Sequence, residues 1–234
     1  SKKGSYGPSL AVKSLSDEKE KEYRKKLSNF SFLSCREQDG AQLLSRITQK
    51  EVKCVLDPTL LLSAKEWGKY CEFEIPKEPY ILVYFLGEKS EHRRAVEKIQ
   101  KLTNWKIISL PAAYLEMENN DYKKVWGGPK EFLSLIRGAA LICTDSFHGT
   151  MFSINFQRNF FSFCKSSDSE ESSENSRLYS ALNIFGLSNR IIHMDNLTAE
   201  DISIDYKNVI PILEEQRRDS IEYLENMLFE MTKG

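Results

Sequence analysis

Apolar and polar positions along this chain follow two periods, one typical of strands and one typical of helices. Continuous apolar runs of strand length occupy residues 80–87 ("YILVYFLG"), 105–110, 140–145 and 160–164. The run at 80–87, rich in aromatic and β-branched residues, is typical of a strand buried on both faces of a parallel sheet. Helical spacing fills the intervening segments at residues 90–103, 127–139 and 149–156. The pattern therefore predicts strands that alternate with helices.

The remaining chain continues this alternation. The predicted elements are a charged helix 17–30 with Ser16 as N-cap, a strand 30–35, a helix 36–47, a strand 52–56, a short helix 63–71 and a closing helix 209–231. A Ser- and Glu-rich stretch at 166–176 predicts a surface loop. Together these elements predict an α/β fold with a mostly parallel, Rossmann-like sheet that contains residues 80–85, 106–109, 141–144 and 160–163.

Composition bounds the size of the fold and its partners. The 234 residues are 41% hydrophobic, which is enough for one large domain or two small ones. Lys and Arg number 33 against 34 Asp and Glu, a net charge of −1, so the whole chain lacks a field that attracts a polyanion. We therefore expect no nucleic-acid partner.

Cysteine usage and hydropathy bear on metal binding and compartment. The five cysteines show no CxxC or Cys/His ligand spacing, which fits free thiols in a reducing compartment and predicts no metal. No apolar stretch reaches the roughly 20 residues that span a bilayer, and the N-terminal residues lack the apolar core of a signal peptide. The sequence predicts a cytoplasmic protein without a transmembrane segment.

One segment, "LICTDSFHGTMFSINF" at residues 141–156, places polar chemistry between a predicted strand and a predicted helix. In open parallel sheets, ligands bind at the carboxyl ends of strands, beside the N-termini of the helices that follow. A helix N-terminus favours an anion, Gly149 permits close backbone approach, and the hydroxyls of Ser146 and Thr150 add donors. His148 can transfer a proton near neutral pH. The pattern predicts an anion-binding turn that carries one acid/base residue.

The run "GPKEFLSLIRGAALICTDSFHGTMFSINFQRNFF" resembles the signature of polysaccharide pyruvyl transferases, in which a Gly-Pro-led helix precedes a strand ending in Thr-Asp/Asn-Ser-Phe-His-Gly-Thr. Three further segments match in family order: "LSCREQDGAQLL" resembles a Ser-x-Arg-Glu segment, "VLDPTLLLSAKEW" an Asp-Pro-Thr-Leu-Leu-x(4)-Trp segment, and "NSRLYSALNIFGLSNRII" a closing Arg-containing helix. Four ordered segments of this kind rarely arise by chance. The chain is therefore similar to this family from about Leu33 to Ile192.

Two features differ from the family pattern. Family members are longer, with an additional N-terminal α/β half, and this chain begins near the family's Tyr-Ala-x-Ser-x-Gly region, loosely matched by "SYGPSLAV". The resemblance thus implies that residues 1–75 are the remainder of an N-terminal half, and that residues 76–234 form a C-terminal Rossmann-like domain with the motif and the closing helix. Many members also carry Arg two residues before the motif His, where this chain has Ser146.

The resemblance implies transfer of the enolpyruvyl unit of phosphoenolpyruvate to hydroxyls of a sugar or lipid-linked oligosaccharide, a precursor of a cell-surface glycan. The product is a pyruvate ketal, phosphate is released, and phosphoenolpyruvate is the donor substrate with no cofactor. The implied fold is one half plus linker of a glycosyltransferase-B-like architecture. Such a reaction needs an acid, a base and anion clamps. His148 fits the acid/base role, and Arg36 and Arg177 fit the clamps because a planar guanidinium binds a carboxylate or phosphate through two parallel bonds.

Each candidate also has a structural alternative. Arg36, which lies beside Glu37 at the start of a predicted helix, fits an N-terminal salt bridge, and Arg177 fits a surface ion pair. Asp145 either orients His148 or caps the helix that follows, and capping is the simpler role. Asp57, which precedes a proline, is typical of a residue that ends a strand and shapes a turn.

The other histidines and the phenylalanines have simpler interpretations. His92 and His193 have no motif around them and are interpreted as incidental. The aromatic stripe is interpreted as core, and comprises Phe152, Phe156, Phe160, Phe161 and Phe163.

Three function classes remain open. The first is the pyruvyl transferase. The second is a nucleotide-sugar glycosyltransferase of the same architecture, whose site also places a helix N-terminus against a diphosphate. The third is a binding domain without activity.

Overall fold

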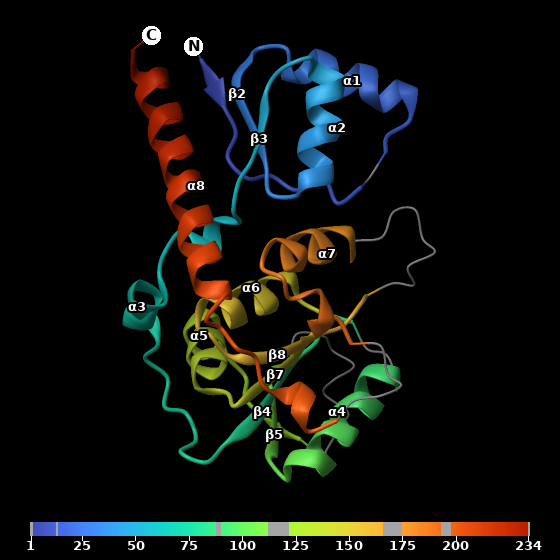
Figure 1. Cartoon of the computed structure of the whole chain (residues 1–234), viewed down its shortest axis with the longest axis vertical. Coiled ribbons are helices and arrows are strands. Elements are labelled where there is room, and N and C mark those ends of the chain that lie inside the picture. The colour runs from blue at the N-terminus through green and yellow to red at the C-terminus, as the bar shows by residue number, and fades with distance from the viewer. Residues whose placement is uncertain are drawn as a thin grey trace. The chain divides into compact units, whose positions relative to one another are not determined.

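The computed structural model of the protein describes residues 2–12, 14–87, 90–111, 122–165, 175–192 and 198–233. The chain divides into two compact units (Figure 1). Unit 1 comprises Ser1–Leu61, Ser166–Ser188 and Lys207–Gly234, and unit 2 comprises Leu62–Lys165 and Asn189–Tyr206. Both units contain parallel strands joined through helices. The predicted fold class, an α/β fold with mostly parallel, Rossmann-like strands, is confirmed.

Unit 1 is built on a three-stranded parallel sheet of order β1-β2-β3. Its elements are β1 (Lys3–Gly4), α1 (Asp17–Leu27), β2 (Phe30–Cys35), α2 (Gln38–Thr48), β3 (Val52–Cys54), α7 (Asn175–Ile184) and α8 (Val209–Thr232). Cys35 is in register with Cys54, so β2 and β3 end at the same edge of the sheet. The helix α2 packs on this sheet through Ala41 and Leu44, and α8 contacts β1. The Ser-x-Arg-Glu segment and the Asp-Pro-Thr segment meet at this carboxyl edge.

Unit 2 is built on a five-stranded sheet of order β6-β5-β4-β7-β8, in which every pair of neighbours is parallel. Its elements are α3 (Ala64–Trp67), β4 (Tyr80–Tyr84), α4 (Ser90–Thr103), β5 (Lys106–Ser109), β6 (Lys123–Lys124), α5 (Pro129–Gly138), β7 (Leu141–Thr144), α6 (Phe147–Asn155) and β8 (Asn159–Ser162). The chain leaves β4 toward β5 on one side and returns to β7 on the other. The boundary between β4 and β7 is therefore a topological switch point, where a crevice opens outside the carboxyl ends of the strands.

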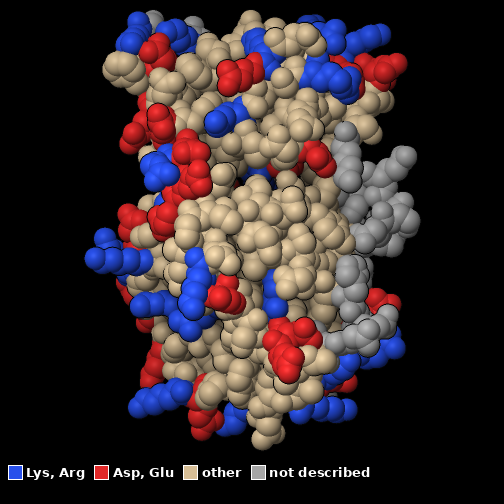
Figure 2. Space-filling view, in the orientation of Figure 1, with Lys and Arg blue, Asp and Glu red and all other residues tan. Residues whose placement is uncertain are grey.

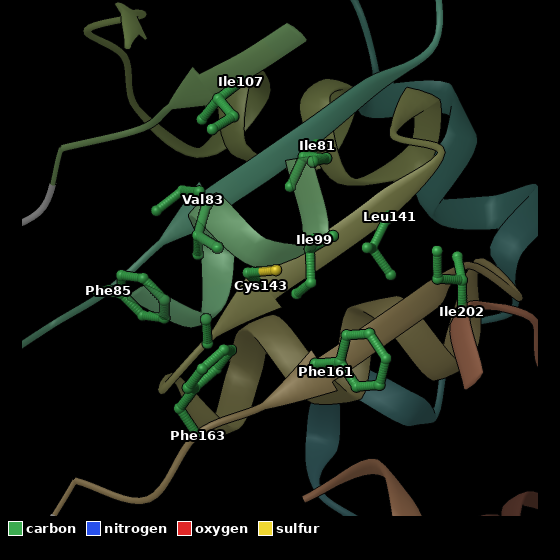
Figure 3. Packing of buried hydrophobic residues seen from close by; sticks show 12 residues of the cluster. Ile81, Val83, Phe85, Ile99, Ile107, Leu141, Cys143, Phe161, Phe163 and Ile202 are labelled. Carbon is green, nitrogen blue, oxygen red and sulfur yellow. The ribbon is translucent and has the colours of Figure 1, made fainter. Parts of the chain in front are cut away.

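Alternate residues of β4 face opposite layers of unit 2. Ile81 and Val83 pack against Ile99 of α4 in a buried apolar cluster that also takes in residues of β5, β7 and β8 (Figure 3). On the other face, Tyr84 contacts Phe132 of α5 with ring centroids 5.1 Å apart. Figure 1 shows α4 on one face of the sheet and α5 with α6 on the other. This two-sided burial explains why the strand sequences are apolar throughout.

Charges of both signs are interspersed on the face of the molecule drawn in Figure 2. Within the described part of the chain, no helix combines the length and apolar character that crossing a membrane requires.

Most predicted elements are present, and the differences lie at their ends. The predicted helix 36–47 begins at Gln38, and the strand 52–56 ends at Cys54. The predicted helix 63–71 is divided into α3 and a 3₁₀ turn, Gly68–Tyr70. Most of the predicted loop 166–176 falls outside the described residues, but its last two residues open α7. The strands β1 and β6 were not predicted, because two residues are too few to show a period.

The helix α6 begins earlier than predicted, so the expected anion-binding turn is the first turn of this helix. Ser146 is the N-cap, and its hydroxyl accepts a hydrogen bond from the Gly149 amide at 3.3 Å. Helical geometry starts at Phe147 and includes His148 and Thr150. The cap satisfies an amide that the first turn otherwise leaves without a helical partner.

Gly149 lets α6 pack closely on β7. A Cβ at this position would lie 2.6 Å from the Thr144 Oγ1 atom, and Thr144 is fully buried. The Thr144 hydroxyl cannot move away freely, because it donates to the Tyr84 carbonyl at 2.6 Å and accepts from the Ser146 amide at 3.0 Å. The absence of a side chain at Gly149 therefore allows α6 to lie close to the neighbouring strand, β7.

We expect Gly149→Ala to destabilise the protein by about 1–3 kcal/mol, the usual cost of overpacking a filled site. Gly68→Ala is the matched control, because its φ of −57° suits any residue and its Cβ would meet only the end of the Arg137 side chain, at 3.3 Å. Urea unfolding followed by circular dichroism compares the two. Equal unfolding free energies for the two variants would contradict the packing described for Gly149.

A second pair of variants tests the core between α4 and the sheet. Ile99 is fully buried, whereas Leu102, three residues later in the same helix, is 42% exposed. We expect Ile99→Ala to cost about 2–5 kcal/mol of unfolding free energy and Leu102→Ala to cost less than about 0.5 kcal/mol. Thermal and urea unfolding measure both, and a similar cost at the two positions would mean that α4 does not pack as described.

Candidate functional site

At the switch point, Asp145 links the segment that follows β7 to the loop that follows β4. Its two carboxylate oxygens accept hydrogen bonds from the amides of Leu86 and Gly87, at 2.6 and 3.0 Å, in the loop that follows β4. Burial raises the pKa of Asp145, and the two amide bonds only partly oppose this effect. The expectation that Asp145 caps α6 is wrong, because Ser146 caps the helix and Asp145 binds the adjacent loop.

His148 is exposed on the first turn of α6. Its ring centroid lies 5.7 Å from that of Phe147, nearly perpendicular to it. Phe152 follows four residues later, and residues at this spacing share a helix face. The imidazole therefore stands at the carboxyl edge of the sheet on a rigid element rather than on a loop.

His148 lines a pocket of about 490 Å³. Tyr84 at the end of β4, Leu110 and Pro111 after β5, and Pro129 at the start of α5 lie around it. Each of these positions belongs to the carboxyl edge of the parallel sheet, where the α/β rule places ligands. Among the described residues that line the pocket, His148 is the only one that was predicted for the anion-binding turn.

The other residues of the motif are buried and bonded within the protein. The Thr150 hydroxyl donates to the Ser146 carbonyl at 3.2 Å and lies 2.8 Å from the Ser162 hydroxyl of β8. The Ser146 hydroxyl caps α6, and Gly149 packs on Thr144. These contacts give all three residues a structural role, and their contact with an anion stays a prediction.

Aromatic side chains from four elements form much of the pocket. The interpretation of Phe156, Phe160, Phe161 and Phe163 as core is confirmed by their burial. Phe152 is buried as well, which confirms the same interpretation, and it also lines the pocket. The other aromatic residues of the pocket are Trp67, Tyr84 and Phe132, which sequence reasoning did not select. The sequence could have indicated two of them, because Trp67 ends a segment that matches the family and Tyr84 ends the central strand. Nothing in the local sequence distinguishes Phe132.

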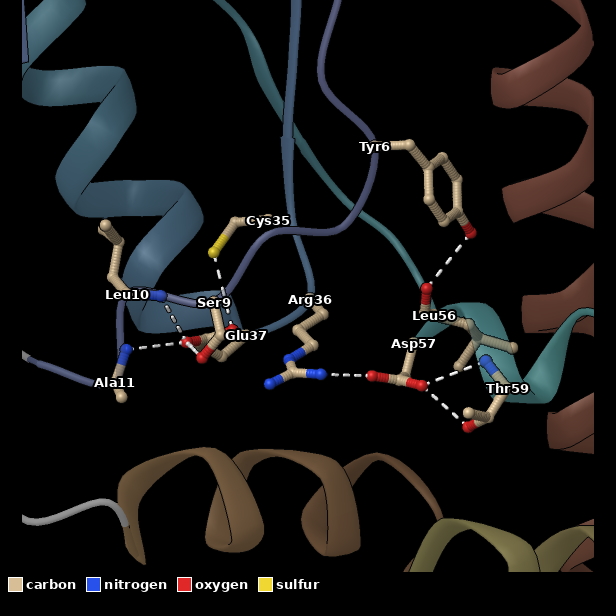
Figure 4. Close-up of polar contacts among 10 residues, drawn as sticks. All are labelled: Tyr6, Ser9, Leu10, Ala11, Cys35, Arg36, Glu37, Leu56, Asp57 and Thr59. Carbon is tan, nitrogen blue, oxygen red and sulfur yellow. Dashed lines mark hydrogen bonds and ion pairs between the residues drawn. The ribbon is translucent and has the colours of Figure 1, made fainter. Parts of the chain in front are cut away.

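In unit 1, the Ser-x-Arg-Glu and Asp-Pro-Thr segments meet through an ion pair (Figure 4). Asp57 pairs through Oδ2 with the Nη1 atom of Arg36, and its Oδ1 accepts from the Thr59 amide at 3.0 Å and the Thr59 hydroxyl at 2.7 Å. Asp57 thereby caps the 3₁₀ turn Pro58–Leu60, which confirms its turn-shaping role. The salt-bridge alternative for Arg36 also holds. Its carboxylate partner comes from the segment after β3, a contact that sequence reasoning did not predict.

Glu37, the next residue after Arg36, fixes the N-terminal loop. Its Oε1 atom accepts hydrogen bonds from the Ser9 hydroxyl at 2.6 Å and from the amides of Leu10 and Ala11 at 2.8 and 2.9 Å (Figure 4). The Cys35 thiol lies 3.5 Å from Oε2, and burial raises the pKa of this thiol to about 12. Adjacent residues of the Arg-Glu pair thus have different roles: one carries an ion pair at the sheet edge and the other is structural.

Arg177 lies half-buried in the first turn of α7, in unit 1. Arg36 belongs to the same unit, whereas His148 belongs to unit 2. The joint action of these three residues on one anion stays a prediction. Among the described residues, no group of three or more His, Cys, Asp or Glu side chains is arranged to hold a metal ion.

Two further ionisable side chains are structural. His92 is buried, its ring lies 5.0 Å from Phe85 and 4.9 Å from Phe163, and its Nε2 atom is 3.3 Å from the Cys164 carbonyl. Arg190 is buried, donates to three carbonyls and lies over the Phe161 ring at 4.4 Å. His193 lies outside the described residues.

The ion pair of Asp57 predicts a pH-dependent stability. Burial alone raises the pKa of this carboxyl, but the Thr59 bonds and Arg36 outweigh it and hold the pKa below its usual value. A lowered folded-state pKa stabilises the protein above the unfolded value of about 3.9, and this contribution is lost as the pH falls through the folded-state pKa. Asp57→Asn should therefore cost about 1–3 kcal/mol at pH 7 and progressively less below pH about 4.

Urea unfolding of wild type and Asp57→Asn between pH 7 and the lowest pH at which both fold measures this difference. Glu20→Gln is the control, because Glu20 pairs with an exposed arginine, Arg46, in the same unit. A cost for Asp57→Asn that stays constant or grows toward acid would contradict the assignment.

Comparison with solved structures gives remote likenesses. The Methanocaldococcus jannaschii UDP-GlcNAc 2-epimerase in complex with UDP-GlcNAc and UDP is 16% identical with a TM-score of 0.46, and the match covers 79% of this chain and 60% of that chain. The wall teichoic acid polymerase TagF is 10% identical with a TM-score of 0.47, over 93% of this chain and 62% of that chain. A Listeria monocytogenes protein described as a putative UDP-N-acetylglucosamine 2-epimerase is 10% identical with a TM-score of 0.44, over 68% of this chain and 51% of that chain.

This chain thus spans less than two thirds of each of these solved proteins. At these identities and TM-scores the likeness carries no conclusion about function. Among curated proteins, none matches the chain by sequence.

Comparison with protein families gives a match over most of the chain. The sequence model of the family described as polysaccharide pyruvyl transferase matches residues 1–163. The matched region contains Arg36, Asp57 and His148 and ends before Arg177. The family resemblance is confirmed over three of the four ordered motifs, and the chain belongs to the polysaccharide pyruvyl transferase family.

Proposed function

We propose that this protein transfers the pyruvyl group of phosphoenolpyruvate to hydroxyls of a sugar in a cell-surface glycan precursor, where it forms a ketal. Membership of the polysaccharide pyruvyl transferase family supports this assignment. The observation that carries the proposal is the position of the motif histidine. His148 is exposed at the carboxyl edge of the sheet and lines a pocket large enough for a substrate.

The chemistry of the reaction assigns His148 its role. The enol carbon C3 of phosphoenolpyruvate gains a proton, and C2, which becomes electron-poor, is attacked by a sugar hydroxyl that loses its proton. A second hydroxyl of the same sugar then displaces phosphate at C2, and its proton leaves with the phosphate. A positioned imidazole can give the proton to C3 or take it from a hydroxyl, and this assistance is worth about 10²- to 10⁴-fold in rate.

The anionic groups of the donor need cations, and we assign this role to Arg36 and Arg177. Arg36 is held by Asp57, which is itself fixed by two bonds from Thr59. A guanidinium is planar and presents its N–H groups in fixed directions, which suits a carboxylate or phosphate. Arg177 is assigned by the family resemblance of its helix alone.

Replacement of the imidazole tests the proposal. We expect His148→Ala to lower the turnover rate by about 10²- to 10⁴-fold while leaving the melting temperature nearly unchanged, because the side chain is exposed. The assay contains phosphoenolpyruvate and a panel of lipid-linked and nucleotide-linked sugars, with phosphate release and the mass of a pyruvyl ketal as readouts. Turnover of His148→Ala at the wild-type rate would show that the catalytic assignment is wrong.

The same assay includes Arg36→Lys, which keeps the charge next to Asp57 but loses the planar fork. It should raise the KM for phosphoenolpyruvate, whereas Arg46→Lys at an exposed pair in the same unit should not. A wild-type protein that consumes a nucleotide-sugar but not phosphoenolpyruvate would favour the glycosyltransferase alternative. A protein that binds glycans and turns over neither donor would favour the binding domain.

A further inference from the structure

The pocket at His148 has an aromatic wall, which we define as Trp67, Tyr84, Phe132 and Phe152. These residues come from α3, β4, α5 and α6. Their rings form a continuous series of edge-to-face contacts, with centroids 5.1 Å apart for Trp67 and Phe152, 5.6 Å for Phe152 and Phe132, and 5.1 Å for Phe132 and Tyr84. Such contacts hold aromatic rings in fixed orientations.

The position of Trp67 in this wall is fixed by its own segment. Ser63 and Glu66 form a reciprocal capping box at the start of α3. The Leu62 carbonyl accepts from the Asn155 side chain at 2.9 Å, and the Gly68 carbonyl accepts from Arg137 at 3.3 Å. Hydrogen bonds thus attach the segment before Trp67 to α6 and the segment after it to α5. These bonds fix the position of the indole ring.

The wall carries no charge that suits an anion. Among the lining residues that the structure describes there is no Lys, Arg, Asp or Glu. Phosphoenolpyruvate bears a carboxylate and a phosphate, and moving such groups onto an apolar surface without a paired cation is costly. The aromatic wall therefore does not suit the donor.

A neutral ring with one apolar face fits the same surface. A pyranose presents C–H groups on one face and hydroxyls around its edge, so the apolar face can pack on aromatic rings while the hydroxyls stay accessible. The pocket volume of about 490 Å³ lies within the usual range for small-molecule sites. His148 shares the α6 face of Phe152, so a ring seated on the wall has its hydroxyls near the imidazole.

From these observations we infer that the aromatic wall seats a sugar ring of the acceptor, and that the anionic groups of the donor bind outside this pocket. The inference rests on the proposed function, because it assigns one of its two substrates to this pocket. Trp67 and Phe132 then determine acceptor affinity and leave donor affinity unchanged.

Binding measurements on the full chain test this assignment. Phosphoenolpyruvate binding is measured by calorimetry. Methyl pyranosides of glucose, galactose, mannose and N-acetylmannosamine are measured by saturation-transfer NMR at millimolar concentration. The variants are Trp67→Leu, Trp67→Phe and Phe132→Leu. The control is Trp105→Phe, because Trp105 packs against the opposite, α4-side core. Melting temperatures confirm that each variant is folded.

We expect at least one glycoside to bind the wild type. Its affinity should fall about tenfold in Trp67→Leu and Phe132→Leu, be largely restored in Trp67→Phe and be unchanged in Trp105→Phe. The dissociation constant for phosphoenolpyruvate should stay within about twofold of wild type in all four variants. Two aromatic positions keep the test valid if one variant fails to fold.

Three results would overturn the assignment: weaker phosphoenolpyruvate binding in Trp67→Leu with glycoside binding intact, no glycoside binding to the wild type, or Trp67-dependent binding of uridine monophosphate in place of the glycosides. Failure of the proposed function looks different. In that case the wild type does not bind phosphoenolpyruvate, while Trp67-dependent glycoside binding is still observed.

Discussion

The parallel pairing of β4 with β7 is the constraint on which the candidate site of unit 2 depends. It brings two strand ends together at the point where the strand order reverses, and two side chains secure that point. The Thr144 hydroxyl binds the last carbonyl of β4, and Asp145 binds the two amides just beyond it. Because α6 starts immediately afterwards, the position of His148 follows from the sheet itself. Motif residues such as Thr144 and Gly149 are therefore required for position before any role in chemistry.

The two units carry different kinds of chemistry. In unit 1, the sheet edge holds an arginine oriented by a buried carboxylate and a glutamate that fixes the N-terminal loop. In unit 2, the sheet edge holds an exposed histidine beside an aromatic pocket whose described lining residues include no Lys, Arg, Asp or Glu. An anionic donor and a neutral, hydroxyl-bearing acceptor need these two kinds of surface. This division supports the assignment of the arginines to the donor and of the aromatic wall to the acceptor.

The sequence predicted much of the fold because buried parallel strands are apolar along their whole length, as in residues 80–84 and 141–144. It placed the start of α6 at Gly149, two residues late, because helical spacing of apolar positions does not show the first turn, and it assigned the cap to Asp145 although Ser146 caps the helix. Local sequence could reveal neither the Arg36–Asp57 pair nor the aromatic wall. Both join residues distant in sequence through strand register and helix packing. The family motifs identified His148, but not what surrounds it.

The most direct test of the central claim follows the proton that the enol carbon must gain. Phosphoenolpyruvate and the acceptor panel are incubated with the full chain in D₂O, and the methyl group of the product is examined by NMR and mass spectrometry. Pyruvyl transfer with general acid catalysis predicts a ketal whose methyl group carries one solvent-derived deuterium, formed in step with phosphate release. An enol group transferred without solvent hydrogen, or a glycosylated product with no pyruvyl methyl group, would contradict the account.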